Sequence, residues 1–261
     1  MSNTSNTNNT SNTSNTSNAS NASNTSNQTS GQQTGNPRAA SAIILIDFDG
    51  VINQFPDDKV RQRQNSTAWM KPGDPRINLY SPANWFIPDN KDTAQAGRFG
   101  RYRILWSSEL VSRLDALTKP TATRDGARII WLSTWQPFTD SLNRALGVDW
   151  PTVEWYDPQT GIGRLTGKRR TVLDRLSDAR PIIWIDDEET TPSAQSALRG
   201  SLPPAPVLAV GPDARIGISR PQMAAIERFA SDPYADVVAD DPDSLVRFDV
   251  VGDTREGHIG F

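Results

Sequence analysis

Four short apolar runs constrain the fold of this chain most strongly. They span residues 42–46, 127–132, 181–185 and 206–210, and each is nearly continuous and rich in β-branched side chains. Strands that are covered on both faces of a parallel sheet have this pattern, whereas half-exposed strands alternate apolar and polar residues. The four runs therefore predict buried parallel strands.

Helical patterns separate these runs. Apolar residues recur at helical spacing in residues 108–118, 138–146, 169–176 and 222–229. Alternation of buried strands with amphipathic helices predicts an open α/β sheet flanked by helices. Ligands bind such sheets at the carboxyl ends of the strands, so the residues directly after each run are the candidates for a site.

The composition divides the chain into three parts. Of the first 30 residues, 26 are Asn, Ser or Thr. Because this repeat cannot bury enough apolar surface to offset the entropy of ordering, residues 1–37 are expected to be a disordered tail. Residues 231–261 carry 8 acidic and 2 basic side chains and are expected to be an acidic, disordered tail. Residues 38–230 are left as one mildly basic domain, although the whole chain has a net charge of −3.

A segment rich in Pro, Gly and Asn interrupts the alternation at residues 55–106, which we interpret as a small insert after the first strand. It contains eight aromatic residues interleaved with arginines, among them Arg98, Arg101 and Arg103. These arginines could bind a nucleotide or nucleic-acid end whose bases stack on the aromatic rings. Alternatively, the aromatic residues form the core of the insert, with the arginines on its surface.

The scarcity of thiol and imidazole groups excludes several chemistries. The chain has no cysteine, and its single histidine is His258, near the carboxyl terminus. Disulfides, thiolate nucleophiles, cysteine zinc sites and histidine triads are therefore excluded. No apolar run has the length of a membrane span, and the chain is expected to be soluble and cytoplasmic. Its oligomeric state is left open.

Two carboxylates follow the first run. Asp47 and Asp49 stand at positions i and i+2, so they point the same way on an extended chain, and Gly50 permits a sharp exit behind them. Considered alone, this motif could also be an ordinary Asp-Gly turn after a strand.

The second and third runs also end in polar residues. Ser133 and Thr134 follow the second run, where a hydroxyl suits an anionic oxygen or serves as a helix N-cap. Asp186 and Asp187 follow the third run and repel each other unless a cation lies among them. The next two residues, both glutamates, are expected at the positive end of the following helix.

Three cations precede the third run. Lys168, Arg169 and Arg170 stand at the expected start of a helix, where positive charge opposes the helix dipole. An anion held there would explain them, and a solvated basic turn is the alternative.

In this order the four motifs resemble those of the haloacid dehalogenase (HAD) superfamily of phosphotransferases, over residues 43–230. The resemblance implies a HAD-like, Rossmannoid sheet with an insert after its first strand. It implies that Asp47 is the nucleophile that forms an aspartyl-phosphate and that Asp49 is the general acid and base. It also implies Mg²⁺ held by Asp47, the backbone carbonyl of Asp49 and Asp187, with Asp186 nearby.

Ser133 and Lys168 are the phosphate-binding residues that the resemblance implies, with Thr134 as the alternative hydroxyl and Arg169 or Arg170 as alternative cations. The expected function is Mg²⁺-dependent hydrolysis of a phosphomonoester, either a phosphorylated small molecule or a nucleic-acid 3′ end. The Ser133-Thr134-Trp135 step is similar to that of HAD domains associated with RNA repair. A catalytically idle module that binds a phosphorylated partner is the alternative.

Overall fold

The computed structural model describes residues 41–96, 100–122, 125–164 and 167–249, all of which belong to one compact unit. The expected amino-terminal tail, Arg98, His258 and the end of the acidic tail lie outside the described residues.

The core is a five-stranded sheet with the order β4-β1-β5-β6-β7. Every neighbouring pair is parallel, and the central strand β1 pairs with both β4 and β5 along its whole length. The strands are β1 (Ile43–Ile46), β4 (Arg128–Trp131), β5 (Ile182–Ile185), β6 (Val207–Val210) and β7 (Val246–Asp249). The four strands predicted from apolar runs are confirmed, because β1, β5 and β6 are buried on both faces and β4 is buried at all but its first residue.

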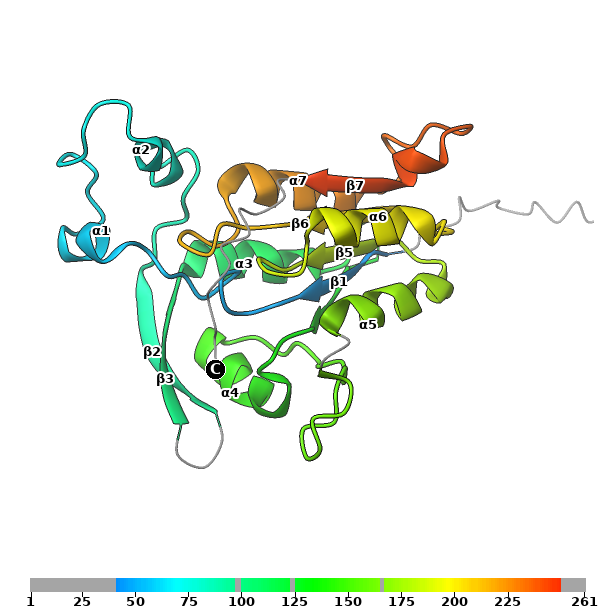
Figure 1. The fold of residues 1–261 in the computed structure, drawn as a ribbon, viewed down its shortest axis with the longest axis horizontal. Helices are drawn as coiled ribbons and strands as arrows, with labels where there is room; N and C mark the ends of the chain where they lie inside the picture. Colours follow the sequence, from blue (N-terminus) through cyan, green and yellow to red (C-terminus); the bar gives the residue numbers. More distant parts are fainter. Residues whose placement is uncertain (1–40, 97–99, 123–124, 165–166, 250–261) are drawn as a thin grey trace, which may run out of the picture. The chain divides into compact units, whose positions relative to one another are not determined.

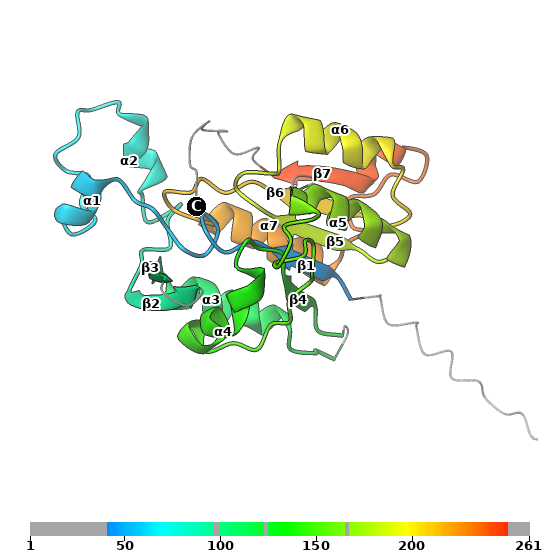
Figure 2. The same ribbon diagram turned by 60° about the horizontal axis from the view of Figure 1, so that its bottom comes forward.

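Helices cover both faces of the sheet (Figures 1 and 2). On one face, Ile44, Ile46 and their neighbours pack against α3 (Ser108–Leu117), α4 (Thr139–Leu146) and α7 (Arg220–Ser231). On the other face, Ile43 and Leu45 pack in a cluster with α5 (Gly167–Arg175) and α6 (Pro192–Gly200). The structure is thus the predicted α/β sheet between two layers of helices. None of the described helices combines the length and apolar composition needed to cross a bilayer.

The expected boundary at residue 230 is wrong, because the sheet continues into the acidic segment. After α7 the described chain runs through a 3₁₀ turn at Pro242–Leu245 and forms β7, which pairs with β6. Val246 is buried in the cluster that contains α5 and α6. The charge count of residues 231–261 concealed this strand, since only alternate residues of an edge strand need to be apolar.

The segment between β1 and α3 lies outside the main sheet. It contains the short helices α1 (Asp58–Gln62) and α2 (Pro75–Leu79), followed by the antiparallel hairpin of β2 (Asn90–Ala96) and β3 (Gly100–Trp106). The reading that the aromatic residues form the core of the insert is confirmed for some of them. Tyr80, Trp85, Phe86 and Trp106 are buried, whereas Phe55 and Tyr102 line a cavity described below.

Two amide side chains join this segment to the end of β1. The backbone N–H of Leu105 donates to Asn53 Oδ1 at 2.8 Å, and the N–H of Gln54 donates to the Leu105 carbonyl at 2.9 Å. The buried Gln54 side chain also accepts from the Trp85 indole at 2.7 Å and donates to the Phe86 carbonyl at 3.0 Å. The hairpin is therefore held at a defined position beside β1.

Replacing Gln54 with Leu tests this attachment. The variant leaves the buried indole N–H of Trp85 and the carbonyl of Phe86 without partners, so its free energy of unfolding should fall by about 2 kcal/mol. The matched control is Gln62→Leu on the exposed face of α1, which should change stability by less than about 0.5 kcal/mol. Urea denaturation measures both, and equal stabilities would contradict the assignment.

Candidate active site

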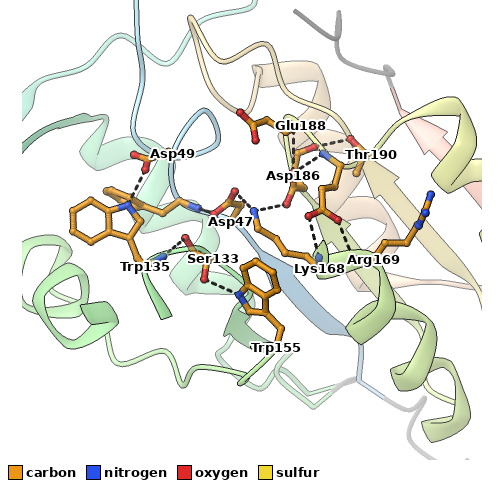
Figure 3. Close-up of polar contacts among 12 residues, drawn as sticks. Asp47, Asp49, Ser133, Trp135, Trp155, Lys168, Arg169, Asp186, Glu188 and Thr190 are labelled. Carbon is orange, nitrogen blue, oxygen red and sulfur yellow. Dashed lines mark hydrogen bonds and ion pairs between the residues drawn. The ribbon is translucent and has the colours of Figure 1, made fainter. Parts of the chain in front are cut away.

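Polar residues from three neighbouring strands meet at one edge of the sheet (Figure 3). Asp47 directly follows β1, Asp186 directly follows β5, and Ser133 is the second residue after the end of β4. Because the strands are parallel and β1 lies between the other two, their carboxyl ends bring these side chains together. Asp47 lines a cavity of about 360 Å³, whose lining also includes Asp49, Tyr102, Arg103, Thr134, Trp135, Trp155, Lys168 and Asp187.

Lys168 joins two of these carboxylates. Its ammonium donates to Asp47 Oδ2 and to Asp186 Oδ2, the latter at 2.8 Å. Lys168 is only 3% exposed and Asp186 is fully buried. Burial opposes the charged form of Lys168, but the negative charges of Asp186 and Asp47 outweigh it and raise the pKa of the ammonium. Removing one partner of such a buried pair typically costs about 3–5 kcal/mol.

Asp187 lies beside this group without a comparable partner. Within the part of the chain that the structure describes, neither a hydrogen bond nor an ion pair satisfies its carboxylate. Burial, followed by the charges of Asp186 and Asp47, raises the pKa of Asp187 to about 9. Gly50 allows this approach, because a Cβ there would lie 2.0 Å from Asp187 Oδ2, and because its φ of +69° is in the left-handed region.

The three carboxylates form a candidate cation site. Asp47, Asp186 and Asp187 each offer an oxygen, and these oxygens lie within 4.8 Å of one another. Burial raises the pKa of Asp47 to about 7, even though Lys168 lowers it. Two buried carboxylates and a half-buried one beside a single ammonium leave an excess of negative charge when all three are ionised, which a divalent cation would neutralise. An all-oxygen donor set suits hard cations such as Mg²⁺ or Ca²⁺.

Unlike Asp187, Asp186 has a hydrogen-bond or ion-pair partner on each of its carboxylate oxygens. Its Oδ1 accepts from the backbone N–H groups of Glu188 and Glu189 at 3.0 and 2.8 Å, while its Oδ2 accepts from Lys168. Asp186 therefore shapes the loop after β5 and holds Lys168, and Asp187 is the more available ligand.

Neutral donors fix both oxygens of Asp49. Asn53 Nδ2 donates to Oδ1 at 2.6 Å, and the Trp135 indole donates to Oδ2 at 2.7 Å. The sharp turn after β1, in which the Phe48 carbonyl accepts from the N–H groups of Ile52 and Asn53 at 2.9 Å, brings Asn53 to Asp49. Asp49 is thus oriented at the cavity wall beside the buried Asp47.

The two candidate hydroxyls occupy different environments. Ser133 is fully buried, and its hydroxyl accepts from the backbone N–H of Trp135 at 3.2 Å and lies close enough to Asp47 to lower the pKa of that aspartate. The Trp155 indole donates to the Ser133 carbonyl at 2.9 Å and holds this backbone in place. Thr134 is exposed and lines the cavity. Ser133 therefore contacts the carboxylate group directly, and Thr134 faces the space where a ligand would lie.

The amino terminus of α5 is occupied by a carboxylate from the protein itself. Glu189 accepts from the backbone N–H groups of Lys168 and Arg169, both at 2.9 Å. The expectation that Glu189 lies at the positive end of the following helix is therefore wrong, since it caps the preceding helix, and Thr191 caps α6. This cap removes the need for an external anion at the α5 terminus and helps to position Lys168.

The alternative cations do not reach the carboxylates. Arg169 donates to Ser193, and Arg170 pairs with Asp174 on the exposed side of α5. Of the three arginines expected to bind substrate, Arg103 lines the cavity, Arg101 is exposed on β3 outside that lining, and Arg98 lies outside the described residues.

Three residues with a positioning role were not identified from the sequence. Asn53 and Trp135 orient Asp49, and Trp155 fixes the backbone of Ser133. Trp135 directly follows the polar step after β4, which could have indicated it. Trp155 is 22 positions away from Ser133 in a loop, where no local pattern predicts the contact.

In comparisons with known proteins, the chain matches no family model, and neither a curated protein nor a solved structure is significantly similar to it. Its function is therefore inferred from the residues and geometry of the site.

Divalent cations should bind the carboxylate cluster more tightly as the pH rises. Protons compete with the cation for Asp47 and Asp187, whose pKa values of about 7 and about 9 lie above those of ordinary carboxyl groups. The apparent affinity for Mg²⁺ should increase at least about 10-fold between pH 6 and pH 8, and protons should be released on binding. Calorimetric titration in buffers of different ionisation enthalpy measures both the affinity and the number of protons released.

The variant Asp187→Asn should weaken Mg²⁺ binding by at least about 10-fold and reduce its pH dependence. Asp240→Asn, at an exposed carboxylate, is the matched control and should bind Mg²⁺ like the unmodified chain. Equal affinities for the two variants would rule out Asp187 as a ligand.

The same pKa shifts predict how stability depends on pH without a cation. A carboxyl group whose pKa is raised by folding stabilises the folded chain most at low pH, and this contribution is lost as the pH rises through the folded pKa. The contributions of Asp47 and Asp187 should thus decline up to about pH 7 and about pH 9. Asp187→Asn should flatten the fall in melting temperature between pH 5 and pH 9, and an unchanged profile would contradict the burial of this charge.

Proposed function

We propose that this chain is a Mg²⁺-dependent phosphomonoester hydrolase of the HAD superfamily that acts through an aspartyl-phosphate on Asp47. One observation carries the proposal: Asp47, Asp49, Asp187 and Lys168 converge on a single cavity at the carboxyl ends of parallel strands. A nucleophile, a proton-transfer group, a cation ligand and a fixed positive charge are the parts that such a reaction requires.

The four motifs occupy positions that support this family. The nucleophile motif follows the central strand, the hydroxyl follows one neighbouring strand and the Asp pair follows the other. The lysine reaches them from the start of the helix that precedes β5. In this proposal the segment between β1 and α3 is the cap, because Phe55, Tyr102 and Arg103 line the cavity from that side.

In the first half-reaction, an oxygen of Asp47 attacks phosphorus, and the bond from phosphorus to the ester oxygen breaks. Asp49 gives its proton to the departing oxygen, so the alcohol leaves neutral. Asn53 and Trp135 hold Asp49 in the required orientation. Lys168 and the Ser133 hydroxyl, which both contact Asp47, bind the phosphoryl oxygens as the new bond forms.

In the second half-reaction, Asp49 takes a proton from water, and the resulting hydroxide attacks the phosphorus of the aspartyl-phosphate. The bond between phosphorus and Asp47 breaks, inorganic phosphate leaves, and the Asp47 carboxylate is restored. Asp47, Asp187 and the backbone carbonyl of Asp49 would hold Mg²⁺, which neutralises charge on the transferring phosphoryl group when bound. Asp186 supports this site by holding Lys168.

Loss of the nucleophile should abolish the reaction. We expect Asp47→Asn to reduce kcat by at least about 1,000-fold towards both glycerol phosphate and a nitrophenyl phosphate in the presence of Mg²⁺. Asp240→Asn serves as the control for a charge change at an exposed position. Equal turnover by Asp47→Asn would exclude the aspartyl-phosphate mechanism, and inactivity of the unmodified chain on every ester would favour a phosphate-binding module.

The role of Asp49 should depend on the leaving group. Asp49→Asn should lower kcat towards glycerol phosphate by about 100-fold or more, because the alkoxide leaves poorly without a proton. Nitrophenolate leaves without protonation, so the formation of the phosphoenzyme from nitrophenyl phosphate should be much less affected. Rapid-quench measurement of the first turnover separates this step from hydrolysis, and equal losses for the two esters would exclude Asp49 as the general acid.

A further inference from the structure

A second cavity, of about 210 Å³, adjoins the candidate active site. Tyr102, Thr134 and Trp135 line both cavities, so the two are neighbours across these side chains. None of Asp47, Asp187 and Lys168 lines the second cavity, whose other walls include Phe138, Tyr156 and Arg164. It is therefore a separate cavity beside the candidate active site.

The walls of this cavity are aromatic and held in place. The Tyr102 ring meets Trp135 edge to face, with 5.8 Å between centroids. Tyr156 packs against Trp155 at 4.6 Å, and its hydroxyl donates to the Thr134 carbonyl at 3.3 Å. Preorganised rings of this kind bind planar groups with little loss of conformational entropy.

The charge at the cavity is positive. The Arg164 guanidinium lies over the Tyr156 ring at 5.8 Å, and within the described part of the chain no carboxylate pairs with it. The cavity lining contains no acidic residue among those described. An uncharged apolar group would form no hydrogen bond with Arg164 or with the Thr134 hydroxyl, whereas a planar group that carries acceptor atoms could accept hydrogen bonds from both.

We propose that the second cavity binds the base of a nucleotide whose phosphate lies against Asp47, an inference that rests on the proposed function. A ring bonded directly to the ester oxygen would stay in the first cavity, beside Asp47 and Lys168. A ring in the second cavity must lie beyond Thr134 and Tyr102, so a spacer such as ribose must separate it from the phosphorus. A free nucleotide and the phosphorylated end of a strand share this chemistry.

The test compares kcat/KM for glycerol phosphate, a nitrophenyl phosphate, 3′- and 5′-nucleoside monophosphates and a 3′-phosphorylated oligonucleotide, using the full chain with Mg²⁺. At least one nucleotide substrate should exceed glycerol phosphate by about 10-fold or more, the range expected for one stacked base. A higher value for the oligonucleotide than for the free nucleotides identifies a strand end as the source. Equal values for all alkyl esters, or a preference for the nitrophenyl ester alone, would overturn the inference.

Variants locate the preference. The ratio of kcat/KM for the nucleotide to kcat/KM for glycerol phosphate should fall by about 10-fold in Tyr156→Ala. In Arg164→Gln the same ratio should fall by about 3-fold. Tyr156→Phe retains the ring and should keep the ratio within about 2-fold. Tyr234→Ala and Arg199→Gln, at exposed positions of the same residue types, are the matched controls. A ratio that survives both Tyr156→Ala and Arg164→Gln would contradict the subsite, and the exposed position of Arg164 provides a variant that should fold.

A binding measurement separates this inference from the proposed hydrolysis. Calorimetric titration of the Asp47→Asn chain with a nucleoside monophosphate and with glycerol phosphate, each with Mg²⁺, requires no turnover. One outcome is that no ester is hydrolysed, that the nucleotide binds at least about 10-fold more tightly than glycerol phosphate, and that Tyr156→Ala removes this difference. That outcome would support the base-binding cavity and contradict the proposed hydrolysis. If glycerol phosphate is hydrolysed by the unmodified chain and the nucleotide binds no more tightly than glycerol phosphate, the proposed hydrolysis is supported and the base-binding cavity is contradicted.

Discussion

The buried ammonium of Lys168 between Asp47 and Asp186 is the interaction on which the rest of this structure depends. It connects the start of α5 and the end of β5 to the end of β1, and Asp47 after β1 is 121 positions away from Lys168. A buried lysine is tolerated only when its charge is paired, and here the pairing also brings the carboxylates together. Glu189 supports the arrangement by capping the helix from which Lys168 projects.

This pairing leaves the site short of positive charge. One ammonium faces Asp47 and Asp186, while Asp187 lies half-buried nearby without a hydrogen-bond or ion-pair partner among the described residues. The raised pKa values of Asp47 and Asp187 reflect burial first and the repulsion among the carboxylates second. A bound cation would offset both the cost of burying these charges and their mutual repulsion. The electrostatics that destabilise the ionised carboxylates in the free site therefore favour cation binding.

A second set of contacts ties the hairpin to the same site. Asn53 accepts from the backbone of Leu105 in β3 and donates to Asp49, so one side chain links the hairpin to the proposed acid and base. Gln54 anchors the preceding loop through Trp85 and Phe86. Because Tyr102 of the hairpin lines both cavities, the position of the hairpin determines the shape of the proposed substrate site.

Much of the fold and part of the site follow from local sequence patterns. Continuous apolar runs predict β1, β4, β5 and β6, because a strand buried on both faces needs apolar residues at every position. The polar residues after those runs identify Asp47, Ser133 and Asp186, since the ends of parallel strands share one edge. The edge strand β7 and the contacts of Asn53, Trp155 and Glu189 have no such local signal. Only the tertiary structure decided them, because each depends on which distant backbone or side chain is brought within hydrogen-bond distance.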